Sequence, residues 1–170
     1  MKKLMMATAI AAVACGCIVK QPIPKGVDAL TDEDISMMVG HAMEKICRDI
    51  NIRRMAGKSP NARIVARIQP FEMPNLPNDT RTREIASELE MRLCKEMTDG
   101  GWFIFLDAAG GAAPGAALQP DCILKGKLSC MIKENGVSST SEFKLQLAMV
   151  DVRTGIVAWK GAVALAKRSE

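Results

Sequence analysis

The sequence predicts an α/β (α+β) fold, in which a mixed sheet ends in a C-terminal antiparallel three-strand meander and is packed by two or more helices. Three observations carry this prediction. Two stretches, 31–49 and 79–99, repeat apolar residues with the period of an amphipathic helix. Residues 62–68 alternate as in a strand, and residues 122–165 contain three strand-like stretches joined by two short turns. Helices must then cover the apolar face of the sheet, which gives a two-layer domain.

The first helical stretch carries a start signal. Thr31 is a good N-cap residue, and Asp34 stands three positions later, as in a capping box. The helix is expected to end near Asp49. His41 falls off the apolar stripe and is predicted to be a surface residue. The inward face comprises Ile35, Met38, Val39, Ala42 and Ile46.

The second helix is predicted to begin at Asp79 or Thr80 and to end before the Gly100-Gly101 pair. Its inward residues are Ile85, Ala86, Leu89 and Leu93. Mixed charge on the other face is typical of a solvated surface. The charged residues are Arg81, Arg83, Glu84, Glu88, Glu90, Arg92, Lys95 and Glu96.

Two further strands are predicted at 62–68 and 102–106, and Pro70 ends the first of them. The loop that follows is rich in proline and is a candidate partner-binding edge, since binding residues are often placed on loops. Its candidate contact residues are Phe71, Met73, Asn75 and Asn78. The Gly/Ala-rich stretch 108–118 lacks the lysine of a phosphate-binding loop and is expected to be a connection.

The C-terminal meander has the clearest pattern. The strands are expected at 122–132, 141–152 and 156–165, and Asn135-Gly136 and Thr154-Gly155 supply the turns. In the middle strand apolar residues alternate with polar ones, which predicts one buried face. The expected inward residues are Phe143, Leu145, Leu147 and Met149.

The N-terminus has the features of an export signal: Lys2 and Lys3, a short apolar run, and small residues before two cysteines. The apolar run is shorter than the roughly 20 residues that span a bilayer. The string A-V-A-C-G-C resembles a bacterial lipobox. Cys17, preceded by Gly16, is the preferred lipidation site, and Cys15 is the alternative. Because no Asp follows either cysteine, sorting to the periplasmic face of the outer membrane is expected.

The chain therefore divides into a signal peptide at 1–16, a lipidated cysteine with a short tether at 17–30, and a domain at 31–170. The tether contains Pro22 and Pro24, and its 13 or so residues reach at most about 43 Å. Without Lys2 and Lys3 the chain has 21 basic residues against 19 acidic ones. Such a small, dispersed net charge, with few aromatic residues, argues against nucleic acid as a partner.

Four cysteines remain beside the lipidation site: Cys47, Cys94, Cys122 and Cys130. In an oxidising compartment they could form two disulfides, in any of three pairings, or they could be buried small residues. No C-x-x-C pair occurs and His41 is the only histidine, so neither a metal site nor a catalytic constellation is predicted. No cofactor is expected beyond the covalent lipid.

Several motifs, taken in order, resemble a known family. They are P-D-C-I-L-K-G-K-L at 120–128, then F-K-L-Q-L-A-M-V-D-V-R-T-G-I-V-A-W-K-G at 143–161. This order is similar to that of the penicillin-binding-protein activator LpoB family. The strand at 62–68, the loop with Asn75 and Asn78, and the helix after it also stand in the family's order.

The resemblance implies a fold similar to the N-terminal domain of TolB and to CsgG-type lipoproteins. It also implies a non-enzymatic outer-membrane lipoprotein, with a class A penicillin-binding protein as partner and peptidoglycan synthesis as the process stimulated. The family's known activators have a long tether, whereas the segment 18–30 is short. The alternative is a TolB- or CsgG-like structural or secretion component of the envelope with another protein partner. The sequence sets no oligomeric state.

Overall fold

A computed structural model describes residues 30–58, 63–106, 119–134, 136 and 138–169. The predicted signal peptide, Cys15, Cys17, the tether up to residue 29 and the Gly/Ala-rich stretch at 108–118 lie outside the described residues, as does Asn135 of the first predicted turn. None of the helices among the described residues is long and apolar enough to cross a membrane.

The first helix, α1 (Asp32–Arg48), forms as its sequence predicts. Thr31 is the N-cap, and the full capping box with Asp34 is present. Three acidic residues in the first turn face the positive end of the helix dipole. All five residues of the expected apolar stripe are buried, and His41 is exposed, as predicted.

The sheet has five strands in the order β2-β1-β3-β4-β5. β1 (Ile64–Ile68) pairs in parallel with β2 (Phe103–Leu106) on one side and with β3 (Cys122–Glu134) on the other. β3, β4 (Ser139–Asp151) and β5 (Val157–Ser169) form the antiparallel meander. The predicted mixed sheet with a C-terminal three-strand meander, packed by helices, is therefore confirmed.

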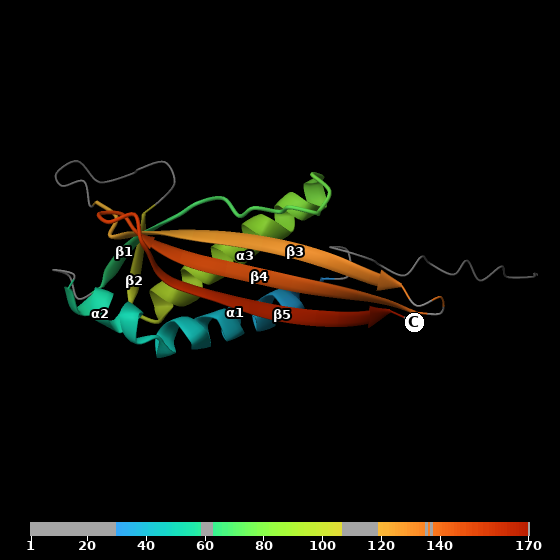
Figure 1. The fold of residues 1–170 in the computed structure, drawn as a ribbon, viewed down its shortest axis with the longest axis horizontal. Coiled ribbons are helices and arrows are strands. Elements are labelled where there is room, and N and C mark those ends of the chain that lie inside the picture. The colour runs from blue at the N-terminus through green and yellow to red at the C-terminus, as the bar shows by residue number, and fades with distance from the viewer. Residues whose placement is uncertain (1–29, 59–62, 107–118, 135, 137, 170) are drawn as a thin grey trace, which may run out of the picture.

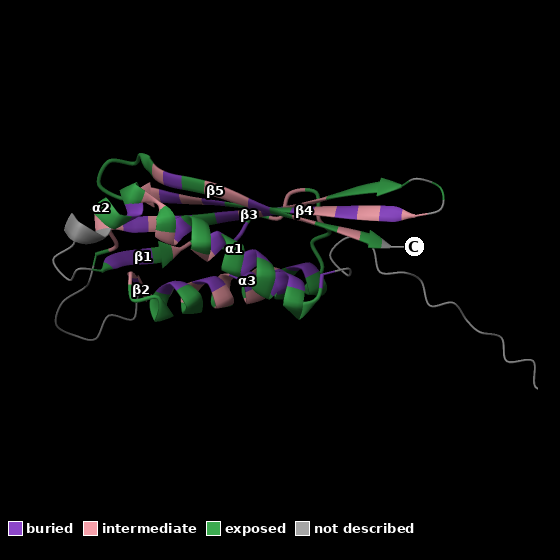
Figure 2. Cartoon of the chain, turned by 90° about the horizontal axis from the view of Figure 1, so that it is seen from below, coloured by how far each residue is buried: buried purple, intermediate pink, exposed green. Residues whose placement is uncertain are grey.

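The helices lie on one side of the sheet, as Figure 2 shows, and the far ends of β3, β4 and β5 extend beyond them (Figures 1 and 2). Alternation along β4 places four large apolar residues in the core between the layers. They are Phe143, Leu145, Leu147 and Met149, each at most 3% exposed. β5 runs to Ser169, four residues beyond the predicted end at 165.

Two helices follow α1. α3 (Thr80–Asp99) has Asp79 as its N-cap, as predicted, and buries Ile85, Leu89 and Leu93. α2 (Ile50–Lys58) was not predicted. It is only nine residues long, contains Gly57, and buries Ile52, so its sequence has little helical periodicity to detect.

The charged face of α3 is less solvated than its sequence predicts. Glu90 and Arg92 are half-buried. Glu90 accepts a hydrogen bond from the backbone N–H of Phe71 at 2.6 Å. Arg92 pairs with Glu88 and donates to Ser36 Oγ and to the Asp32 carbonyl of α1. The prediction of a solvated surface is wrong at these two positions and at Glu88, which is also half-buried. Glu90 and Arg92 connect α3 to neighbouring elements, and Glu88 pairs with Arg92.

Asp34 connects the start of the domain to its last strand. Its Oδ2 accepts hydrogen bonds from Thr31 N at 2.8 Å, from Thr31 Oγ1 at 2.7 Å and from Lys167 Nζ of β5 at 2.6 Å. Burial tends to raise the pKa of Asp34, but the hydrogen bonds from Lys167 and Thr31 outweigh it and hold the pKa below its ordinary value. The carboxylate therefore takes part in the cap of α1 and also forms an ion pair with Lys167 that joins α1 to β5.

We expect Asp34→Asn to lower the free energy of unfolding by about 1–2 kcal/mol at neutral pH, since it removes the capping carboxylate and leaves Lys167 without its anion. Because the folded pKa is depressed, the contribution is full above the unfolded pKa of about 3.9 and is lost as the pH falls through the folded pKa. Urea denaturation between neutral and acid pH measures it. An equal loss of stability at every pH would contradict this origin.

Candidate functional site

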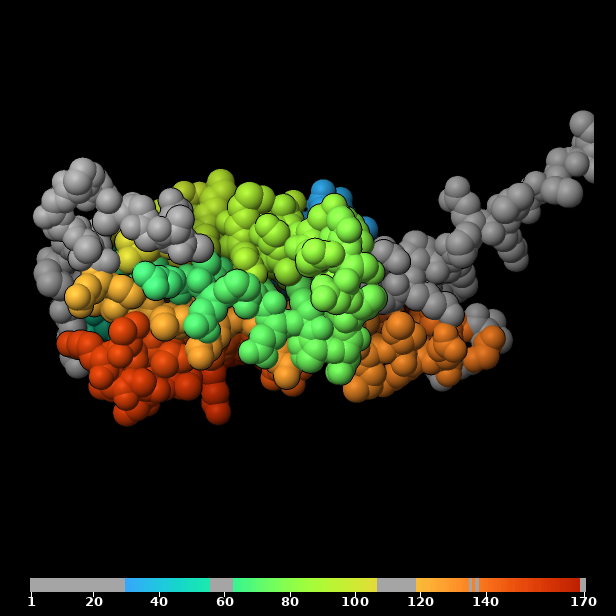
Figure 3. All heavy atoms as spheres, turned by 90° about the horizontal axis from the view of Figure 1, so that it is seen from above, coloured from blue at the N-terminus to red at the C-terminus, as the bar shows by residue number. Residues whose placement is uncertain are grey.

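The segment after β1 continues along the edge of β3. Gln69 N donates to the Leu124 carbonyl, Glu72 N to the Gly126 carbonyl, and Leu128 N to the Glu72 carbonyl, each at 2.9 Å. Glu72 thereby forms an isolated parallel bridge with Lys127. Figure 3 shows this segment, in green, lying against the orange strand β3. We call residues 71–78 the edge segment.

The edge segment is held by one aromatic ring. Phe71 is 7% exposed, and its ring occupies the place where Gly126 of β3 has no side chain. A Cβ built on Gly126 would overlap three atoms of the ring. Glycine is therefore required at this point of β3 for close approach, which is one of the reasons a glycine occurs inside a strand.

The backbone of the edge segment is fixed at two further points. Phe71 N donates to the Glu90 carboxylate of α3, as described above. Asn75 adopts φ 70°, and it is the only non-glycine residue with a positive φ among those described. Asn tolerates this left-handed conformation better than most residues. The segment is thus a defined surface feature.

The four candidate contact residues occupy different environments. Phe71 is buried, so it positions the edge segment and offers no ring to a partner. Met73 is half-buried and packs against the core. Asn75 and Asn78 are exposed. Partner binding by the edge segment stays a prediction, with the exposed asparagines as the accessible members.

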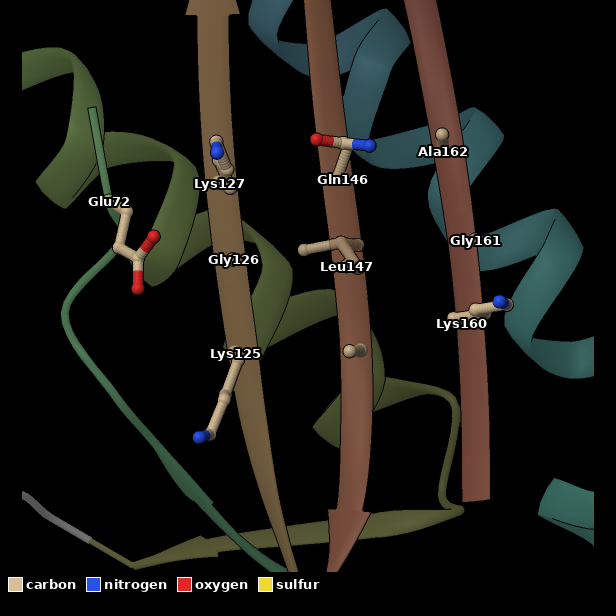
Figure 4. A pocket seen from close by; sticks show the side chains of 10 residues that line it. Glu72, Lys125, Gly126, Lys127, Gln146, Leu147, Lys160, Gly161 and Ala162 are labelled. Atoms are coloured by element: carbon tan, nitrogen blue, oxygen red, sulfur yellow. The ribbon is translucent and has the colours of Figure 1, made fainter. Parts of the chain in front are cut away.

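The side of the meander turned away from α1 and α3, called the outer face, has a hollow of about 550 Å³ beside the edge segment. Its floor contains Ala148 and Ala162, whose small side chains leave the space open. Its rim carries three lysines and the edge-segment carboxylate, as Figure 4 shows: Lys125, Lys127, Lys160 and Glu72.

A second hollow of about 420 Å³ lies farther along the same face. Asn75 of the edge segment lines it, together with Lys144 of β4 and Ala164 of β5. The edge segment therefore borders both hollows. The structure thus places the proline-rich loop beside the polar face of the meander, although the two are separated in the sequence.

The lysines of the outer face come together through strand register. Lys125 and Lys160 flank Ala148 in one cross-strand row. Lys127 lies two residues beyond Lys125 on β3. Lys144 lies four residues from Ala148 on β4, in the same direction along the sheet. None of these four lysines forms an ion pair with the residues that the structure describes. The sequence suggested dispersed charge, but alternation places these cations on one side of the sheet.

The motif residues near the strand ends have structural tasks. Asp121 joins β1 to β3, since its Oδ2 accepts from Val65 N at 2.9 Å and its N–H donates to the Val65 carbonyl at 2.7 Å. Asp151 Oδ1 accepts from the N–H groups of Thr154 and Arg153, each at 2.9 Å. The hydrogen bonds from Thr154, with smaller help from Arg153, lower the pKa of Asp151. Gly155 supplies the positive φ of that turn, 69°.

The four cysteines are free thiols in the structure: Cys47, Cys94, Cys122 and Cys130. Burial, aided by Asp121 and Asp151, raises the pKa of Cys122 to about 12. Burial and Glu90 raise the pKa of Cys94 to about 11. Both thiols are therefore poor nucleophiles at neutral pH. Disulfide pairing among the four stays a prediction.

The described residues contain no group of three or more histidine, cysteine or acidic side chains placed to hold a metal ion. His41 is exposed on α1. The outer face presents cationic side chains around two hollows whose floors carry small residues.

A family model describing the peptidoglycan-synthase activator LpoB matches residues 106–165. Over these residues the chain is similar to that family. The match spans β3, β4 and most of β5, and it includes Gly126, the two aspartates at the strand ends, and Trp159. No protein of curated function matches the chain in sequence.

Several solved structures resemble the fold. The LpoB C-terminal domain from Escherichia coli is 18% identical, with 68% of this chain and 93% of that chain covered and a TM-score of 0.40. The corresponding domain from Salmonella enterica is 15% identical, with 67% and 94% covered and a TM-score of 0.35. Lipoprotein GNA1162 from Neisseria meningitidis is 14% identical, with 62% and 84% covered and a TM-score of 0.42.

We expect Gly126→Ala to destabilise the protein by about 1–3 kcal/mol, because the new methyl group collides with the Phe71 ring and must displace it. In a Phe71→Ala background the same change should cost much less, since the space is already vacant. Chemical denaturation of the wild type, both single variants and the double variant measures this coupling.

Gly40→Ala is a matched control for the glycine substitution. A Cβ at Gly40 would meet nothing within 4 Å, and the residue lies inside α1. This change should stabilise the protein by about 0.5–1 kcal/mol through helix propensity. Additive effects of Gly126→Ala and Phe71→Ala would show that the two residues do not depend on each other.

Proposed function

We propose that the chain is a lipid-anchored periplasmic protein of the outer membrane that binds a class A penicillin-binding protein and stimulates its peptidoglycan synthesis, without catalysis of its own. The observation that carries this proposal is the family-model match over residues 106–165. Fold alone does not define function, so the proposal also needs a surface that could bind a protein.

The edge segment supplies such a surface. Its first two residues are fixed by the packing of Phe71, by Glu90 and by the bridge to β3, which sets where the exposed residues that follow leave the sheet. Preorganisation of this kind reduces the entropic cost of binding. Asn75 and Asn78 present amide groups that can donate and accept hydrogen bonds, and Met73 lies beside them as an adaptable apolar contact.

The membrane attachment rests on the N-terminal sequence. Cys17 is proposed as the lipidated residue and first residue of the mature protein, with Cys15 as the alternative; residues 1–16 would be removed as the signal peptide. The described domain begins at Leu30, which is buried at 2% exposure. Residues 18–30 would then be the tether, with the reach of about 43 Å given above.

Palmitate incorporation tests the anchor. We expect the wild type and Cys15→Ser to incorporate labelled palmitate and to appear in the membrane fraction, because Cys17 follows a small residue at the usual signal length. Cys17→Ser should remain unlabelled and unprocessed. Loss of label in Cys15→Ser alone would assign the lipid to Cys15. Label in neither the wild type nor the variants would exclude lipid anchoring.

Binding to a synthase tests the partner. The mature chain, used as bait, should retain a class A penicillin-binding protein from envelope extracts and increase the rate of that enzyme in a glycosyltransferase assay. Asn78→Arg should weaken binding by about ten-fold, the effect of losing about 1.4 kcal/mol at an interface. Asn51→Arg, an exposed change on α2, is the matched control and should bind as the wild type does.

Two results would contradict the partner proposal. Failure to retain any penicillin-binding protein would favour a different envelope partner, as expected for a TolB- or CsgG-like component. Retention without an increase in synthesis rate would leave a binding protein that is not an activator.

A further inference from the structure

The outer face carries a cluster of cations that the proposed partner site does not use. Lys125, Lys127, Lys144 and Lys160 project from three neighbouring strands, and we call them the lysine face. Lys125, Lys144 and Lys160 are exposed, and Lys127 is half-buried. Figure 4 shows three of the four around the first hollow.

The lysine face is electrostatically unbalanced. With strands about 4.8 Å apart and alternate residues about 7 Å apart along each strand, the Cα atoms of these lysines lie within about 15 Å of one another. Only the closer pairs lie within the Debye length of about 10 Å at 0.1 M salt, so repulsion among the four is partly screened. Nearby acids offset only part of this charge, since Glu142 already pairs with Lys133 at 2.7 Å, and Glu72, on the same rim as three of the lysines, is one carboxylate against four cations.

The composition of the lysine face fits a diffuse anionic surface better than a protein. Protein interfaces favour arginine and aromatic residues and are depleted in lysine. The described aromatic residues of the meander, Phe143 and Trp159, are 1% and 6% exposed and belong to the core. The floor between the lysines consists mainly of alanines, with Gln146 and Ser129, and holds no aromatic or arginine anchor for a protein hot spot. Lysine is a compact charge on a flexible stem that suits mobile anionic groups.

We propose that the lysine face rests on the anionic phospholipid headgroups of the membrane that holds the lipid anchor. This inference rests on the anchoring part of the proposed function. A tether with a reach of about 43 Å keeps the domain close to that membrane. Juxtamembrane lysines are attracted to anionic lipids, and a basic patch combined with an acyl chain is a recognised two-signal attachment. The two hollows accommodate headgroups between the lysine side chains.

Contact through the lysine face would fix the orientation of the domain. α1 and α3 cover the opposite side of the sheet and would face away from the membrane (Figure 2). The edge segment lies along the border of the lysine face, so its exposed residues would point parallel to the membrane surface. Met131, which is 60% exposed on the same face of β3, lies where a side chain could enter the headgroup layer.

Lysine footprinting of the lipidated full-length protein tests the inference. The protein is reconstituted into vesicles of phosphatidylcholine, or of phosphatidylcholine with phosphatidylglycerol, and treated with a water-soluble amine-acetylating reagent. We expect acetylation of the four lysines to fall by about five-fold in the anionic vesicles, the effect of about 1 kcal/mol per lysine. Lys95 on α3 is the internal control and should react equally in both.

Salt and charge removal make the test sharper. About 1 M salt shortens the Debye length to about 3 Å and should abolish the protection. In Lys125→Gln/Lys160→Gln, the remaining Lys127 and Lys144 should become as reactive as in neutral vesicles. Arg54→Gln/Arg83→Gln removes two exposed charges from the helical side and should leave the protection unchanged.

The outcomes separate this inference from the proposed function. Equal acetylation in both vesicles, with the protein floating with the lipid, would overturn the lysine face as a membrane contact and leave the anchor intact. A protein that does not float with vesicles would contradict the anchor and, with it, the inference. Protection that appears in neutral vesicles only after a synthase is added would assign the lysine face to an acidic protein surface instead.

Discussion

The contact between Phe71 and Gly126 is the interaction on which the position of the edge segment depends. A glycine inside a strand lowers the free energy of unfolding by about 0.5–1 kcal/mol relative to alanine, whereas burial of a phenylalanine ring raises it by about 1.5–3 kcal/mol. With the ring in place, the backbone of Glu72 bridges β3, and the segment that follows stays at the sheet border. Without it, the border of both hollows would have no fixed position.

The LpoB-like motif residues mainly maintain the sheet. Asp121 fastens β1 beside β3, while Asp151 and Gly155 shape the turn between β4 and β5. The ring of Trp159 packs over Gly161, where an added Cβ would lie 2.7 Å from Cζ2 of the indole. The surfaces that these residues support are the edge segment and the outer face, which are the two that we propose as binding surfaces.

Local signals were sufficient to predict most of the fold. The capping box of Thr31 and Asp34, the alternation through β4 and the turn at Gly155 each follow from a few neighbouring residues. α2 was missed because nine residues hold too few buried positions to reveal a period.

The candidate site was harder to predict, because its parts are distant in the chain. Gly126 within a strand was a signal for close approach, but nothing in the sequence named Phe71 as its neighbour. The lysine face joins residues from three strands, and its existence depends on register. The half-buried states of Glu90 and Arg92 likewise depend on which elements pack against α3. Sequence periodicity shows which face a residue occupies on its own element, not what lies opposite.

The order of strands in the sheet has a consequence for how the protein opens. β3, β4 and β5 are neighbours in sequence and form contacts of short range, whereas β1 must insert between β2 and β3 and is fastened by a carboxylate 56 positions away. Long-range pairings pay a larger loop-closure entropy. The meander can therefore form from nearby parts of the chain, and the edge segment belongs to the part that assembles later. A destabilisation confined to the β1 side of the sheet would then detach the edge segment while most of the meander remained paired.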